Sequence, residues 1–156
     1  MPFGFVYALS SSVMPCVYKI GFTDRSPRER ARELSTSSGV PVPFDVACYF
    51  EADDSRLVEQ AIHRQLAPHR INQQREFFSL HPAHLYAAMR YYAQEYGCCG
   101  LVDFDSAPEM AASLGNDPSA MKAVERWRPG EEMDKALAAA FDGFYAGPLG
   151  RRRIAQ

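Results

Sequence analysis

The chain has 156 residues, of which 47% are hydrophobic, and a formal net charge of −2. This length suits one domain with a small addition, and the composition excludes a disordered or fibrous protein. A net charge near zero excludes a molecule that attracts nucleic acid over its whole surface, so any polyanion must meet a local basic patch.

The cysteines and the hydropathy pattern indicate the compartment. The four cysteines form no C-x-x-C pair, which favours reduced thiols in a cytoplasm. No apolar run approaches the ~20 residues of a membrane helix, and the N-terminus lacks a signal-peptide profile. We therefore expect a soluble cytoplasmic protein with no membrane partner. The spacing of His69, His81 and His84 and of the cysteines fits no closed tetrahedral site, so we expect no structural zinc.

The first predicted elements are a hairpin and a helix. Residues 5–7 and 18–21 alternate aromatic, β-branched and polar side chains, and residues 10–15 separate them, which places Tyr7 and Lys19 on neighbouring strands. A Ser-x-x-Glu capping box then starts a helix at Ser26. On a helical wheel Arg30 borders the apolar stripe, so it is the arginine expected to lie against the hairpin.

The middle of the chain predicts a third strand and a second helix. Residues 44–51 are apolar and aromatic enough for a strand, and residues 55–67 form a helix capped by Asp53 or Asp54. Glu59 and His63, one turn apart, lie at the edge of its buried face. The side chains expected on that face are Leu57, Val58, Ala61, Ile62 and Leu66.

The pattern beyond the second helix is less regular. Residues 68–75 form a basic loop, and periodicity does not separate an extra strand from a packed turn at residues 77–80. A third helix runs from His81 to about Tyr96, with Gly97 as its stop signal. Helical patterns follow at residues 118–127 and 131–145, after an acidic stretch with Asp103, Asp105 and Glu109, and residues 151–153 are three arginines in a tail.

Five ordered elements resemble the GIY-YIG nuclease superfamily. Residues 5–7 look like a variant of its first motif, and residues 19–23 read K-I-G-F-T, as in the phage and bacterial branch that includes the T5 phage open-reading-frame-172-like group. The likeness continues through Glu59-x-x-x-His63, Arg70 and the R-E-F-F run that starts at Arg75. It covers roughly the first half of the chain.

The resemblance implies a fold, an activity and a set of catalytic residues. It implies phosphodiester hydrolysis in DNA, with Tyr7 orienting or deprotonating the attacking water, Arg30 holding the scissile phosphate and Glu59 binding one divalent metal. A lone carboxylate suits Mg²⁺ or Mn²⁺. His63 and Lys19 complete the set, although Lys19 stands where the superfamily more often has tyrosine; it would bind phosphate or share in proton transfer.

Basic residues near these motifs are candidates for DNA contact. The interpretation competes with surface ion pairs, because Glu29 and Glu33 lie on the same helix. Glu76 either supports the site or partners an arginine. The candidate DNA-contacting residues are Arg25, Arg28, Arg32, Arg70 and Arg75.

Together these patterns predict an α/β (α+β) protein with a small three-stranded antiparallel sheet flanked by helices. Residues 1–97 form the nuclease-like domain, and residues 98–156 form a helical C-terminal extension of unknown role. Two alternatives to an endonuclease stay open. One is a catalytically silent nucleic-acid-binding module on the same fold, and the other is a phage-related protein-interaction factor.

Overall fold

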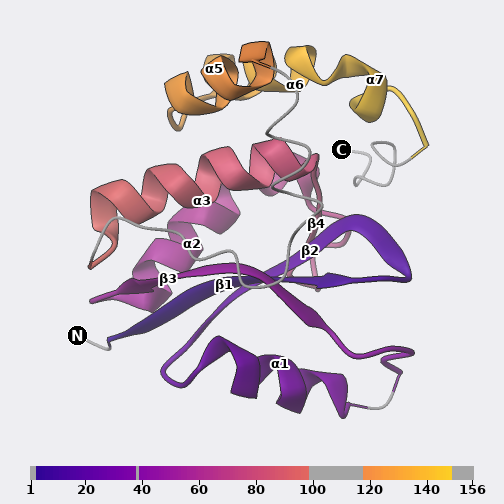
Figure 1. Ribbon diagram of the computed structural model, residues 1–156, viewed down its shortest axis with the longest axis vertical. Helices are drawn as coiled ribbons and strands as arrows, with labels where there is room; N and C mark the ends of the chain where they lie inside the picture. Colours follow the sequence, from indigo (N-terminus) through magenta and orange to yellow (C-terminus); the bar gives the residue numbers. More distant parts are fainter. Residues whose placement is uncertain (1–2, 38, 99–117, 149–156) are drawn as a thin grey trace.

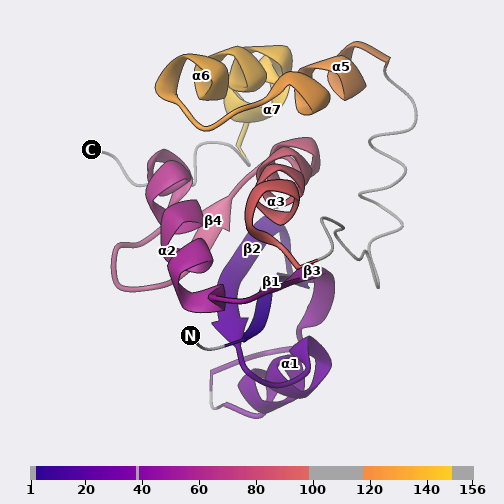
Figure 2. The ribbon, with the colours of Figure 1, turned by 90° about the vertical axis from the view of Figure 1, so that its left-hand side faces the viewer.

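A four-stranded antiparallel sheet with strand order β3-β1-β2-β4 forms the centre of the computed structural model, which describes residues 3–37, 39–98 and 118–148. The strands are β1 (Gly4–Ser11), β2 (Met14–Thr23), β3 (Asp45–Ala52) and β4 (Phe77–Ser79). One helix covers one face of the sheet and two cover the other (Figures 1 and 2). They are α1 (Pro27–Ser35) on the first face and α2 (Ser55–Gln65) and α3 (Pro82–Tyr96) on the second. The predicted α+β class is therefore confirmed.

The strand count differs from the prediction. Residues 77–79 form a fourth strand, which pairs with residues 17–19 of β2. Three residues are too few for side-chain alternation to identify a strand, so only the partner strand decides the conformation. The first two strands also extend further than the alternation indicates, because Ser11 pairs with Met14 across a two-residue turn. Main-chain hydrogen bonds in such a turn do not require apolar side chains.

The helices begin where their caps predict. The Ser26 hydroxyl accepts a hydrogen bond from the Glu29 N–H at 3.5 Å, and Asp54 accepts one from the Leu57 N–H at 3.2 Å. Asp54, not Asp53, is thus the cap of α2. The helix ends at Gln65, and a short 3-10 segment, η1 (Ala67–His69), follows it.

The buried face of α2 is rotated from the predicted one. Ser55, Val58, Glu59 and Ile62 are the buried residues of this helix, at i, i+3, i+4 and i+7. Leu57, predicted to be buried, is 61% exposed. Successive residues are about 100° apart on a helix, so a face centred on Val58 and Ile62 turns Leu57 to the solvent. The same rotation brings Glu59 inside the protein.

The described part of the C-terminal extension packs over α3 (Figure 1). It consists of α5 (Pro118–Arg126), α6 (Glu131–Ala140) and α7 (Asp142–Tyr145). Trp127 and Leu137, 1% and 2% exposed, belong to the same hydrophobic cluster as Met89 of α3. The sequence-based boundary after residue 97 stays a prediction, since the two parts share a core. The acidic residues 103–109 and the arginines 151–153 lie outside the described residues.

In the described ranges, no helix combines the length and the apolar character that crossing a bilayer requires.

Candidate functional site at the edge of the sheet

The candidate site lies along the outer edge of β2, just beyond the residues that pair with β4. The Ile20 N–H donates a hydrogen bond to the Glu76 carbonyl oxygen at 3.1 Å. The Ile20 carbonyl oxygen lies 2.7 Å from Nε2 of His63. The loop before β4 and helix α2 are therefore both fixed to the same point of the strand.

Tyr7 enters the site across Gly21, its partner in the hairpin register. The Tyr7 side chain is buried, with 2% of the residue exposed. A Cβ atom at position 21 would stand 2.5 Å from the Tyr7 hydroxyl oxygen. Only glycine lets the phenol lie against the β2 backbone.

The Tyr7 hydroxyl is hydrogen-bonded to the Arg30 guanidinium, which reaches it from α1. Burial raises the pKa of Tyr7; the hydrogen bond and charge of Arg30 lower it, Glu76 and Glu59 raise it, and the net pKa is above the ordinary value. The phenol is therefore protonated near neutral pH. Because a guanidinium only donates, the Tyr7 oxygen accepts and its own proton remains for another acceptor.

Glu59 and His63 form a close pair on α2, as their spacing predicts. Nε2 of His63 lies 2.8 Å from Oε1 of Glu59, and Glu59 is 4% exposed. Since the carboxylate and the Ile20 carbonyl are both acceptors, Nε2 carries the proton and donates to them. A buried carboxylate held in this way is oriented by its neighbours, not by solvent.

Glu76 completes a three-residue cluster with this pair. One potential ligand atom from each of Glu59, His63 and Glu76 lies within 4.8 Å of the others. Lys19 Nζ is 3.0 Å from Glu76 Oε2, so Lys19 neutralises part of the cluster's negative charge. Two carboxylates beside one imidazole fit a divalent ion that prefers oxygen ligands. The sequence indicated Glu59 alone as a ligand.

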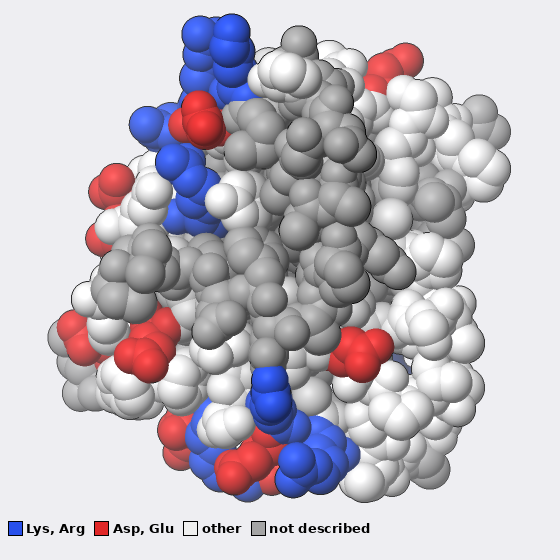
Figure 3. Space-filling view, viewed as in Figure 1, with Lys and Arg blue, Asp and Glu red and all other residues white. Residues whose placement is uncertain are grey.

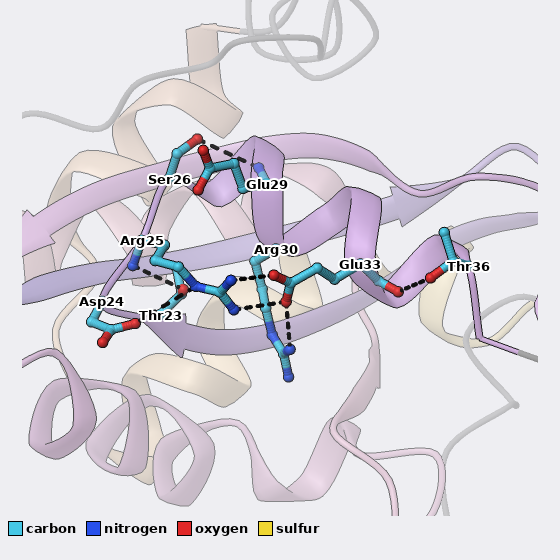
Figure 4. A network of polar contacts seen from close by, with 8 residues as sticks. All are labelled: Thr23, Asp24, Arg25, Ser26, Glu29, Arg30, Glu33 and Thr36. Carbon is cyan, nitrogen blue, oxygen red and sulfur yellow. Dashed lines mark hydrogen bonds and ion pairs between the residues drawn. The ribbon is translucent and has the colours of Figure 1, made fainter.

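A shared carboxylate links two of the predicted arginines. Arg25 Nη2 donates to Oε2 of Glu33 at 2.8 Å, and Arg30 Nη1 lies 3.1 Å from the same oxygen (Figure 4). Hydrogen bonds from Arg25 and then Arg30 lower the pKa of Glu33. Basic and acidic side chains are intermixed on the surface of α1 (Figure 3). The Arg30–Glu33 contact has the i,i+3 spacing that a helix allows, whereas the Tyr7–Arg30 contact has no such local signal.

Four of the predicted DNA-contacting arginines line three different pockets. Arg28 and Arg32 are exposed and line a pocket together with Asp45. Arg25 lines a second pocket beside Arg30, and Arg75 lines a third beside Lys19.

Arg70 has a different position. Its Nε donates to the carbonyl oxygens of Asn72 and Arg75 at 3.2 and 2.9 Å, and its guanidinium lies 5.7 Å from the centre of the Phe78 ring. These contacts hold the loop that carries Glu76.

The antiparallel sheet and the helices that cover its two faces define an α+β domain. The family model of the T5orf172 domain matches residues 4–93, and the chain belongs to this family, which is associated with nuclease-like function. Comparisons with curated proteins and with solved structures found no match.

Proposed function

We propose that this protein is a GIY-YIG-type endonuclease of the phage and bacterial K-I-G-F-T branch, which hydrolyses phosphodiester bonds in DNA with one divalent metal ion. The observation that carries this proposal is that the Tyr7 hydroxyl interacts with Arg30 and also with the charges of Glu76 and Glu59, while Glu59 is paired with His63. Membership in the T5orf172 domain family supports it.

Glu59 would hold the metal ion, with Glu76 and His63 beside it. Mg²⁺ and Mn²⁺ match this donor set, because both favour carboxylate oxygens and retain several waters. Such an ion stabilises the negative charge that develops on the phosphate oxygens. Lys19, bonded to Glu76, limits the repulsion between the two carboxylates.

Arg30 would bind the scissile phosphate, since its guanidinium borders an open pocket while its hydrogen bonds to Tyr7 and Glu33 fix its orientation. Tyr7 would orient the attacking water through its hydroxyl proton. Its raised pKa argues for orientation and against deprotonation of the water by a resting tyrosinate. His63, which is anchored to the Ile20 carbonyl oxygen, would hold the Glu59 carboxylate in position.

The deciding experiment incubates the full chain with labelled single-stranded and duplex DNA in Mg²⁺, Mn²⁺ or a chelator. Metal-dependent cutting that disappears in Arg30→Ala would support the endonuclease and exclude a contaminating nuclease. DNA binding without cutting would identify a silent nucleic-acid-binding module. Neither binding nor cutting would favour a protein-interaction factor.

A further inference from the structure

A second cluster of titratable side chains consists of residues that the sheet-edge site does not use. It joins three separate elements: His69 ends η1, His84 lies on the first turn of α3, and Asp134 lies on α6. The side chains of His69, His84 and Asp134 are 2%, 0% and 12% exposed. The cluster therefore lies where the C-terminal helices cover the first half of the protein.

Both histidines direct their Nε2 atom to the carboxylate of Asp134. Nε2 of His69 lies 3.0 Å from Oδ2 of Asp134, and Nε2 of His84 lies 2.6 Å from Oδ1. One potential ligand atom from each residue lies within 4.8 Å of the others. Ligand atoms of a tetrahedral zinc ion are about 3.3 Å apart, given Zn–N and Zn–O distances of about 2.0 Å. Small side-chain shifts would therefore place all three around one ion.

The far side of the His84 ring is already held in place. Nδ1 of His84 lies 2.8 Å from the Tyr145 hydroxyl, and this oxygen also accepts a hydrogen bond from the His81 N–H at 3.2 Å. Metal-binding histidines commonly have such a partner on the second ring nitrogen, which fixes the orientation of the ring. The His69 and His84 rings meet edge to face, with centroids 4.6 Å apart, so that both nitrogens point to Asp134.

The charge of the Asp134 carboxylate and the open side of the cluster also suit a cation. Burial raises the pKa of Asp134, but hydrogen bonds from His69 and His84 lower it by a larger amount. The net pKa is below the ordinary value, so the carboxyl group is ionised. On one side His69 and Asp134 line an open groove, which they share with Arg64 and Lys135. The groove leaves room for a water molecule as a fourth ligand.

We propose that His69, His84 and Asp134 form a binding site for a divalent transition metal of the zinc class, separate from the Glu59 cluster. Two imidazoles and one carboxylate are ligands that Zn²⁺ prefers, whereas Mg²⁺ favours oxygen-only sites. The site ties α6 to η1 and α3, so the metal fastens the C-terminal extension to the first half. This proposal stands whether or not the protein cleaves DNA.

The alternative to a metal site is a latch made only of hydrogen bonds, and the histidine tautomers separate the two. Without metal, both Nε2 atoms carry the proton, because each faces a carboxylate oxygen. With metal on Nε2, the proton of His84 resides on Nδ1 and is donated to Tyr145. Metal binding would therefore leave the His84 proton on Nδ1, where the Tyr145 oxygen accepts it.

The first test titrates Co²⁺, a coloured substitute for Zn²⁺, into full-length protein that has been stripped with chelator. We expect one equivalent to give the visible ligand-field bands of a four-coordinate ion, and Zn²⁺ to displace it. Asp134→Asn should weaken Zn²⁺ binding by more than about 100-fold. Removing a residue that only hydrogen-bonds to a metal ligand costs about 10–100-fold, so a larger loss indicates that Asp134 is itself a ligand. The matched control, Glu59→Gln, should keep the bands. Absent bands in the parent, unchanged binding in Asp134→Asn, or bands lost in Glu59→Gln would each overturn the proposal.

A second test needs no substitution, which matters if Asp134→Asn fails to fold. The chain has four histidines, few enough to follow individually in long-range ¹H–¹⁵N spectra of the parent. Zn²⁺ should convert His84 from the Nε2–H to the Nδ1–H tautomer and shift the Nε2 signal of His69, while His81 keeps its tautomer. An unchanged His84 tautomer at saturating Zn²⁺ would leave the latch as the correct description.

Discussion

The Tyr7 hydroxyl lies so close to Gly21 that a Cβ atom at position 21 would stand 2.5 Å from its oxygen. This contact couples the second strand of the hairpin to the position of the phenol. It also explains why the K-I-G-F-T run has a glycine at position 21: any larger side chain would displace Tyr7 from Arg30.

Gly21→Ala should therefore abolish DNA cleavage while the metal affinity of the Glu59 cluster is retained. We expect it to destabilise the protein by about 1–3 kcal/mol, as overpacking of a tight site does. Cleavage assays and urea denaturation measure the two effects. Gly143→Ala is the matched control, since an added Cβ there meets nothing within 4 Å. Full cleavage by Gly21→Ala would show that the position of Tyr7 is not required.

Arg30→Ala should reduce the cleavage rate by at least about 10²–10³-fold, as loss of one transition-state donor does. The fold should survive, because Arg30 is half-buried and its ion-pair partner Glu33 is also bound by Arg25. Single-turnover cleavage and circular dichroism provide the measurements. Arg126→Ala removes an exposed arginine from the end of α5 and should cut at the parent rate. An Arg30→Ala protein that cuts as fast as the parent would refute the assigned role.

Glu59→Gln keeps the shape of the side chain and removes its charge, so Mn²⁺ affinity should fall at least 10-fold, by roughly the 1.4 kcal/mol to which a factor of ten corresponds. Binding is best measured with uncleavable DNA present, because phosphate oxygens supply ligands that the protein does not. Glu125→Gln, an exposed position on α5, serves as the control. Equal Mn²⁺ affinity in Glu59→Gln and parent protein would remove Glu59 from the metal site.

The rotated face of α2 can be tested by a pair of stability measurements. Ile62 is 0% exposed, so Ile62→Ala should lower the free energy of unfolding by about 2–5 kcal/mol. Leu57→Ala should change it by less than about 0.5 kcal/mol, since Leu57 is exposed. Similar urea midpoints for the two variants would contradict the orientation of this helix.

Arg75 and Arg70 should differ in how they affect DNA binding. Arg75 is exposed beside Lys19, so Arg75→Ala should weaken binding and reduce the salt slope by about one. Arg70→Ala should instead release the loop that carries Glu76 and lower metal affinity. Fluorescence anisotropy over a range of salt concentrations gives the slope. A salt slope that Arg75→Ala leaves unchanged would exclude a phosphate contact by Arg75.

Local patterns predicted most of the first half of the fold. Caps at Ser26 and Asp54 and the spacing of Glu59 and His63 are signals contained in a few neighbouring residues, and the structure has them where the sequence indicates. The prediction that Leu57 is buried was wrong, because a hydrophobic residue next to a buried face does not show how the helix is rotated about its axis. Tertiary packing decides that rotation.

A single sequence contains no signal for contacts between residues that are far apart along the chain. Glu76 lies 57 residues after Lys19, and Asp134 lies 50 residues after His84. The expectation of no structural zinc rested on histidines and cysteines alone, whereas the site proposed above includes Asp134, which only the packing of α6 brings to His69 and His84. Gly21 belonged to a recognised motif, yet its contact with Tyr7 depends on the hairpin register.

The shared core of the two halves also affects how the protein folds during synthesis. When residues 1–97 have left the ribosome, the surface of α3 that packs on Trp127 and Leu137 is still uncovered. Leu137 is about 40 residues further along, which takes about 2–8 s at about 5–20 residues per second. During that interval the nascent chain exposes apolar surface, and early termination would leave a product with the same surface uncovered.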